Sequence, residues 1–66
     1  MLDQGREAYA RSAWAQAYDS LARADELEPL AADDLELLAI SAYMLGREDE
    51  WSRVLERAYL RRSEAG

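Results

Sequence analysis

The stretch Gly5–Pro29, GREAYARSAWAQAYDSLARADELEP, alternates bulky and very small residues at helical spacing. Its apolar residues recur every three or four positions, which indicates helix rather than strand. A surface helix needs only one apolar stripe, so small residues such as Gly5 and Ala17 predict that a second helix comes close to them. Proline cannot continue a helix, and Pro29 should therefore end the pattern.

Comparison of the chain with itself reveals a repeat of this pattern at a shift of 34 residues. Small residues then coincide with small ones, and large residues with large ones. The coincident pairs are Gly5 with Ala39, Ala8 with Ala42, Tyr9 with Tyr43, Ser12 with Gly46, Leu21 with Leu55, and Ala24 with Ala58. The sequence thus predicts two related units, about 1–30 and about 33–64, within one domain that spans residues 1–66.

Capping and stop residues divide each unit into two helices. Asp3 is expected to cap a helix that reaches about residue 11, and a short turn leads into a second helix over about 14–27. Asp33 is expected to cap a third helix with Glu36 as its capping-box partner, and Gly46 to end it. The fourth helix should begin at about residues 47–49. The predicted fold class is all-α, with two helix-turn-helix hairpins that form a short solenoid.

The helix faces can be assigned from the same spacing. Ala17 and Ala24 are expected in the close helix contact, and Ala15 and Ala22 on the solvent side.

Small residues on the first helix, an Ala-x-x-x-Leu-x-x-Ala series on the second and a following proline resemble the tetratricopeptide repeat (TPR). The first unit matches through Gly5, Trp14, Ala17, Leu21, Ala24, Leu27 and Pro29, and the second through Leu35, Leu38, Ala39, Tyr43, Gly46, Leu55 and Ala58. Two positions depart from the pattern, because Trp51 stands where the first unit has Ala17 and Glu48 where it has Trp14. The resemblance implies TPR-like packing, with an altered last hairpin.

The longer stretch from Gly5 to Trp51 is similar to the helical segment near the N-terminus of bacterial LuxR-like regulators. In those proteins the remaining parts carry a helix-turn-helix or a catalytic domain. The resemblance implies a bacterial source and a role as the helical arm of a regulatory protein.

Composition and charge exclude several classes of function. The 66 residues include 14 acidic and 8 basic ones, and the formal charge of −6 repels phosphate backbones and anionic lipid. We therefore expect neither direct nucleic-acid binding nor membrane binding. The chain lacks an apolar run long enough to span a bilayer and does not begin like a signal peptide, which predicts a cytoplasmic location.

The sequence predicts no enzyme, no cofactor and no metal site. Without His or Cys, the serines have no suitable base beside them, and the acidic clusters lack the alternating carboxylates and central glycine of a calcium loop. The clusters are interpreted as solvated helix ends. Arg53, Arg57 and Arg61 form a basic stripe, for which ion pairing with acidic neighbours is favoured over phosphate binding.

The most informative segment is LELLAISAYML, Leu35–Leu45, in which only Glu36 and Ser41 are polar. Packing within a hairpin accounts for part of this apolar surface but does not explain Leu37, Ile40 and Met44. By the TPR resemblance, a concave face that binds peptides or partner helices would be lined by Arg6, Tyr9, Ala10, Glu36, Ile40, Tyr43 and Met44.

These observations predict a non-catalytic protein-interaction module, in which apolar side chains bind a protein or peptide partner while Arg6 and Glu36 fix its orientation. The same surface could instead cover a further repeat or a second copy, and a homodimer or higher oligomer is expected because a core this small is marginal. The alternative is a small-molecule-sensing domain of a transcription regulator, with a pocket between Trp14, Tyr18, Trp51 and Tyr59. A DNA-binding fragment is a further class.

Overall fold

The computed structural model describes residues 2–65, without the side chain of Ala65, and consists of four α-helices in this range. They are α1 (Leu2–Ala10), α2 (Trp14–Leu27), α3 (Ala32–Met44) and α4 (Glu48–Ala65). The described residues contain no strand, and the prediction of an all-α fold is confirmed.

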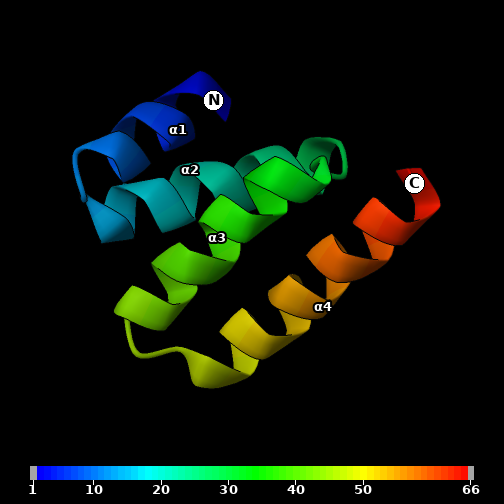
Figure 1. The fold of residues 1–66 in the computed structure, drawn as a ribbon. Helices are drawn as coiled ribbons and strands as arrows, with labels where there is room; N and C mark the ends of the chain where they lie inside the picture. Colours follow the sequence, from blue (N-terminus) through cyan, green and yellow to red (C-terminus); the bar gives the residue numbers. More distant parts are fainter. Residues whose placement is uncertain (1, 66) are drawn as a thin grey trace.

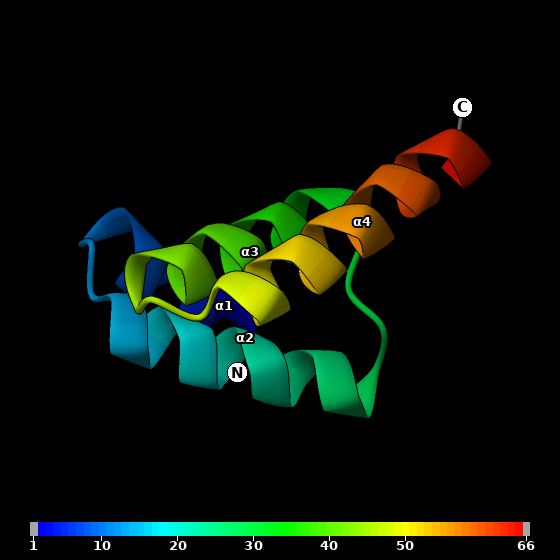
Figure 2. The ribbon, with the colours of Figure 1, turned by 90° about the horizontal axis from the view of Figure 1, so that it is seen from below.

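The helices pack in chain order, with α3 at the centre. Helix α1 packs against α2, and α3 lies against both of them and against α4 (Figure 1). The perpendicular view shows α3 and α4 side by side in one layer, with α2 beneath them (Figure 2). This central position explains why most of α3 is apolar, since three helices pack against it.

The two helices of the first hairpin approach each other most closely at Gly5, which is buried. A Cβ atom added there would lie 2.7 Å from Cγ and 2.9 Å from Cδ2 of Leu21, closer than carbon atoms normally pack. Leu21 is itself fully buried. The predicted close contact at the small residues of the first unit is therefore confirmed at Gly5.

The core is built mainly from the small and aliphatic residues that the helical spacing selects. Its buried hydrophobic members are Ala8, Ala17, Leu21, Leu30, Leu35, Leu38, Ala39, Ala42, Val54 and Ala58. Ser41 is buried among them, and its hydroxyl donates to the Leu37 carbonyl oxygen one turn earlier at 2.8 Å. This bond gives the buried hydroxyl of Ser41 a hydrogen-bond partner within its own helix.

The turns inside the two hairpins have the same backbone structure. Ser12 (φ 60°) and Gly46 (φ 80°), which coincide at the 34-residue shift, both adopt the left-handed conformation common after a helix. Matching backbone bonds close the two turns, namely Ser12 N to Tyr9 O (2.9 Å) and Ala13 N to Ala8 O (2.8 Å), and Gly46 N to Tyr43 O (2.9 Å) and Arg47 N to Ala42 O (2.9 Å). The repeat seen in the sequence is thus present in the backbone of both turns.

The predicted caps are wrong at both acidic residues. Asp3 lies within the first turn of α1, and α3 begins at Ala32, so that Asp33 also lies inside its helix. Ala31 precedes α3, and no side chain caps that end. The carboxylates stay close to the positive end of the helix dipole, which favours them there without a capping bond.

Candidate interaction surface

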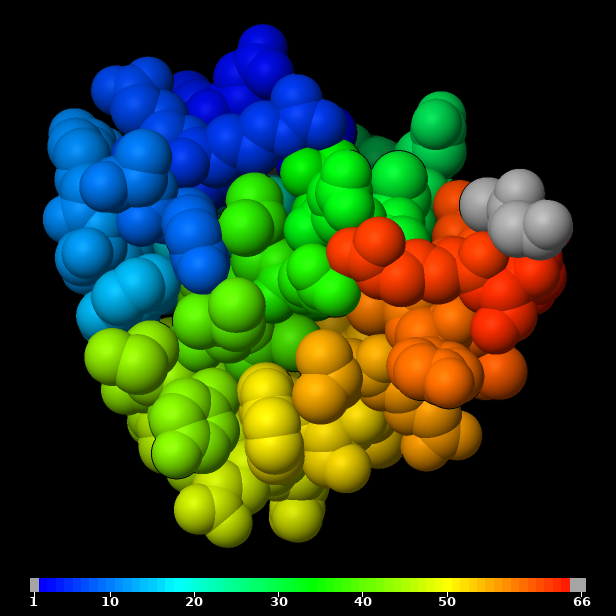
Figure 3. Space-filling model, viewed as in Figure 1, coloured from blue at the N-terminus to red at the C-terminus, as the bar shows by residue number. Residues whose placement is uncertain are grey.

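Three exposed apolar side chains of α3, Ile40, Tyr43 and Met44, form a surface that we call the α3 face. Their exposed fractions are 37%, 52% and 50%, whereas Leu38 and Ala39 on the inner side of the helix are buried. Spacings of three and four residues place the three side chains on one side of the helix. Figure 3 shows atoms of α3 at the surface between α1 and α4.

Trp51 of α4 continues the α3 face toward the neighbouring helix. Its ring centroid lies 5.2 Å from that of Tyr43, with the planes tilted by 52°, and the side chain is half-buried. The position that a fully buried Ala17 occupies in the first unit is therefore taken by an aromatic ring that packs beside Tyr43. This contact is how the last hairpin accommodates a Trp at the position of Ala17.

Arg6 binds within the chain. Its Nε and Nη2 donate to the two carboxylate oxygens of Asp34 at 2.9 and 2.8 Å, which joins α1 to α3. Asp34 is only 6% exposed, and the hydrogen bond to this carboxylate raises the pKa of Arg6. A bidentate pair of this kind holds both partners in place. Arg6 therefore fixes α1 against α3, with Nε and Nη2 of its guanidinium bound to Asp34. Its role in orienting a partner stays a prediction.

Glu36 is engaged in the same way on the other side of α3. Arg62 of α4 lies 2.8 Å from Glu36 and donates to Asp33 at 3.1 Å through the same Nη2 atom. The pKa of Arg62 is raised, first by its hydrogen bond to Glu36 and then by the charge of that group. The two charged residues predicted to bind a partner thus connect α3 to its neighbours.

Tyr9, the remaining predicted site residue, packs against Trp14 at the turn between α1 and α2. The ring centroids are 5.4 Å apart and the planes meet edge to face at 76°. Tyr9 is half-buried, while the adjacent Ala10 is exposed. Of the seven predicted residues, the three on the α3 face and Ala10 are exposed apolar groups, and Arg6, Tyr9 and Glu36 make packing or ionic contacts within the chain.

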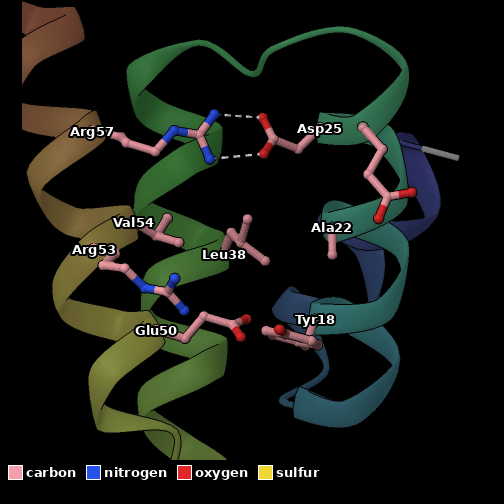
Figure 4. Close-up of a pocket in the computed structure, with 9 residues that line it drawn as sticks. Tyr18, Ala22, Asp25, Leu38, Glu50, Arg53, Val54 and Arg57 are labelled. Atoms are coloured by element: carbon pink, nitrogen blue, oxygen red, sulfur yellow. Dashed lines mark hydrogen bonds and ion pairs between the residues drawn. The ribbon is translucent and has the colours of Figure 1, made fainter.

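A groove runs between α2 and α4, with Leu38 of α3 and Val54 of α4 at its base (Figure 4). At one end Nη1 and Nη2 of Arg57 donate to the two carboxylate oxygens of Asp25 at 2.8 and 2.9 Å. Asp25 also accepts the Leu30 backbone N–H at 3.1 Å. The bond from Arg57 is the main reason that the pKa of Asp25 is lowered, against the opposing effect of burial. This pair bridges helices of the two units.

The predicted aromatic pocket does not form. Tyr18 lines the groove of Figure 4 and carries the Arg47 guanidinium at 4.7 Å from its ring centre, whereas Tyr59 lines a hollow on the outer side of α4. Trp14 and Trp51 pack against Tyr9 and Tyr43, respectively. The four rings therefore do not line a common pocket.

The basic stripe of α4 is partly neutralised, as its sequence interpretation predicts. Arg57 is bound to Asp25, and Arg53 lines the same groove beside Glu50. The acidic partners Asp25 and Asp34 were not identified from the sequence, since each lies about thirty positions from its arginine. Only the register between helices brings them together, and no local pattern carries that register.

Within residues 2–65 no group of three or more acidic side chains is placed to hold a metal ion. The described helices include none that is both long and apolar enough to cross a membrane. Comparison with known proteins returns no matching family model, no matching curated protein and no matching solved structure.

Proposed function

We propose that this chain is a non-catalytic protein-interaction module whose α3 face binds apolar side chains of a protein or peptide partner. The observation that carries the proposal is the exposure of Ile40, Tyr43 and Met44 on a helix whose other sides are packed. Contiguous exposed apolar groups of this kind mark interaction sites more often than solvated surface.

The α3 face has the composition of a binding site. An aliphatic, an aromatic and a thioether side chain lie together, and aromatic residues and Met are enriched in the cores of interfaces. The flexible Met44 can adapt to partners of different shape. The intrachain pairs Arg6–Asp34 and Glu36–Arg62 hold α3 in place on both sides, which keeps the α3 face preorganised and reduces the entropy lost on binding.

We further propose that the module is TPR-like and serves as the helical arm of a bacterial regulator. The close contact at Gly5, the matching left-handed turns and the 34-residue period all support a relationship to helical repeats. The regulatory role rests on the sequence resemblance alone. A cytoplasmic location and the absence of direct nucleic-acid binding belong to the same proposal.

The proposal can be tested with peptides selected on the purified protein from a displayed random library. The variant Trp14→Phe leaves Trp51 as the single tryptophan, and this residue packs against Tyr43 of the α3 face. A bound peptide should therefore change the Trp51 emission in a saturable way.

Met44→Asp should weaken binding of the selected peptide at least tenfold, because a carboxylate cannot be buried against apolar groups without a partner. Leu27→Asp is the matched control, since Leu27 is 76% exposed on α2. Equal affinity of the two variants would contradict the proposal, as would a failure of repeated selections to yield any saturable binder.

A small-molecule sensor is the second candidate, and the groove in Figure 4 is the observation that favours it. The groove combines the apolar base of Leu38 and Val54 with polar walls, as ligand sites often do. A thermal-shift screen against metabolites, repeated with Ala22→Trp to fill the groove, tests this candidate. A hit that the filled variant no longer binds would favour it over the α3 face.

A further inference from the structure

The outer side of α4 carries a second apolar surface that is separate from the α3 face. Leu55, Tyr59 and Leu60 are 38%, 74% and 54% exposed, and Ser52 and Glu56 complete the lining of a hollow there. Helix α4 lies at the edge of the molecule and packs against α3, with its outer side open (Figure 1).

The internal repeat shows that this surface is covered in the first unit. Leu55 coincides with Leu21, which is fully buried and packs against Gly5 of α1, and Tyr59 coincides with Asp25, which is bound to Arg57 of α4. The last unit of a helical array normally has a more polar outer face than the inner units. Here the reverse holds, since an ion-paired Asp is replaced by an exposed Tyr.

Five residues along α4 follow a 4-3-4-3 spacing, which keeps them on one side of a helix. They are Glu48, Ser52, Leu55, Tyr59 and Arg62, and we call them the α4 seam. The seam is acidic at its N-terminal end, basic at its C-terminal end and apolar in the middle. It also has a small residue on one side of Leu55 and a large one on the other.

This order is complementary to itself when the direction is reversed. A two-fold axis at Leu55 would place Leu55 on Leu55 of the second copy, Ser52 opposite Tyr59, and Glu48 opposite Arg62. Large then meets small and acidic meets basic, as an isologous contact requires.

Both charged ends are able to make the contact. Glu48 is exposed and makes no ion pair among the described residues. Arg62 uses Nη2 for Asp33 and Glu36, and an arginine carries further donors on Nη1 and Nε.

We infer that a second copy of this chain binds the α4 seam in antiparallel orientation about a two-fold axis at Leu55. The dimer buries the apolar centre of the seam twice and forms two symmetric Glu48–Arg62 pairs at its ends. The seam contains none of the three residues of the α3 face, so this inference is argued from other residues than the proposed function.

Cross-linking tests the position of the axis, since the chain has no cysteine of its own. Leu55→Cys puts a single thiol on the axis, where two copies can form a disulfide. Arg53→Cys is the control, because two residues turn a helix by about 200° and place this exposed side chain in the groove toward α2, away from the seam. Under mild oxidation at micromolar concentration, Leu55→Cys should form covalent dimer at least tenfold faster than the control variant, and most of it should end as dimer. Equal rates would overturn the inference.

Charge exchange tests the partner and the orientation. Glu48→Arg and Arg62→Glu each place like charges at both ends of the dimer, and each alone should sediment mainly as monomer under conditions where the unmodified chain has twice the mass of one chain. A mixture of the two variants restores both opposite-charge pairs and should recover the dimer. Because Arg62 also binds Glu36, recovery on mixing separates the contact between copies from a loss of folding.

Three outcomes would overturn the inference. They are a monomeric unmodified chain at millimolar concentration, a mixture that remains monomeric, and a dimer that Ile40→Asp dissociates while the seam variants leave it intact. The last result would place the second copy on the α3 face instead.

Discussion

Substitution of Gly5 by Ala tests the closest helix contact of the fold, because two opposing effects can be compared. A Cβ atom would lie 2.7 Å from Cγ, 2.9 Å from Cδ2 and 3.2 Å from the backbone N of Leu21. The first atom is not the flexible end of a side chain, and the last belongs to the backbone. Relief of the overlap therefore requires α1 to move away from α2.

The expected balance is a loss of stability. Overpacking of a core contact typically costs ~1–3 kcal/mol, whereas replacing Gly by Ala inside a helix contributes about 1 kcal/mol in its favour. Gly5→Ala should thus lower the free energy of unfolding by roughly 1 kcal/mol, which corresponds to a fall in Tm of about 4–8 °C for a domain of this size. Thermal unfolding followed by circular dichroism at 222 nm, a general helix signal, measures this fall in Tm.

The same substitution in a Leu21→Ala chain tests whether the overlap with Leu21 causes the loss of stability. In a Leu21→Ala chain the overlapping Cγ and Cδ2 atoms are gone, so that Gly5→Ala should become nearly neutral or stabilising. An osmolyte such as trimethylamine N-oxide can keep both backgrounds folded. The reasoning would be refuted if Gly5→Ala stabilised the unmodified chain by the full helix-propensity gain, because α1 and α2 could not then be in close contact.

Three further predictions follow from particular contacts. Ala17→Leu should destabilise the fold by ~1–3 kcal/mol. Ala15→Leu, at an exposed position, should destabilise it by less than about 0.5 kcal/mol. Similar denaturant midpoints for the two variants would show that the faces of α2 are misassigned. Arg6→Ala should lower Tm because it leaves the buried Asp34 carboxylate without its partner, and adding Asp34→Asn should recover part of the loss; no recovery would contradict this mechanism. The pKa of Asp25 is lowered, so the Asp25 carboxylate contributes fully to stability above its ordinary pKa of 3.8 and loses this contribution as the pH falls through the lowered pKa. Asp25→Asn should therefore flatten the acid side of the stability–pH curve.

The helices could be predicted from the sequence because their signals are local. The period of three to four residues, Pro29 and Gly46 fix where three of the helices begin or end, and the 34-residue comparison pairs the two turns. The close contact at Gly5 was also accessible, since a Gly inside a helical pattern costs helix stability and usually marks a place where a neighbouring element packs closely. These features depend on neighbours within one turn or on an internal copy of the same pattern.

Contacts between distant elements could not be read in this way. Arg6 was assigned to a partner because an exposed-looking charge gives no sign of the carboxylate of Asp34 across the next hairpin. Ala22 was placed on the solvent side, but it is half-buried in the groove where α4 comes near α2. The Arg6–Asp34 pair and the burial of Ala22 both arise from the register between helices, which depends on the packing of the whole chain.

The α3 face could be predicted from the sequence only in part. Leu37, Ile40 and Met44 were predicted as apolar residues that one hairpin cannot bury. The structure leaves Ile40 and Met44 exposed, but Leu37 is half-buried and packs against the core. The sequence could not show that the charged members of the predicted site are bound within the chain. The remaining candidate site is thus smaller and more apolar than the sequence indicated.

The central claim, that the α3 face is where a partner binds, can be tested by methyl NMR with two single reporters. Ile40 is the only isoleucine of the chain and lies on the α3 face, while Val54 is the only valine and is buried at the base of the groove. When the selected peptide is added to protein with ¹³C-labelled Ile and Val methyl groups, the Ile40 signals should shift and saturate while the Val54 signals stay in place. Shifts confined to Val54, with Ile40 unchanged, would contradict the account.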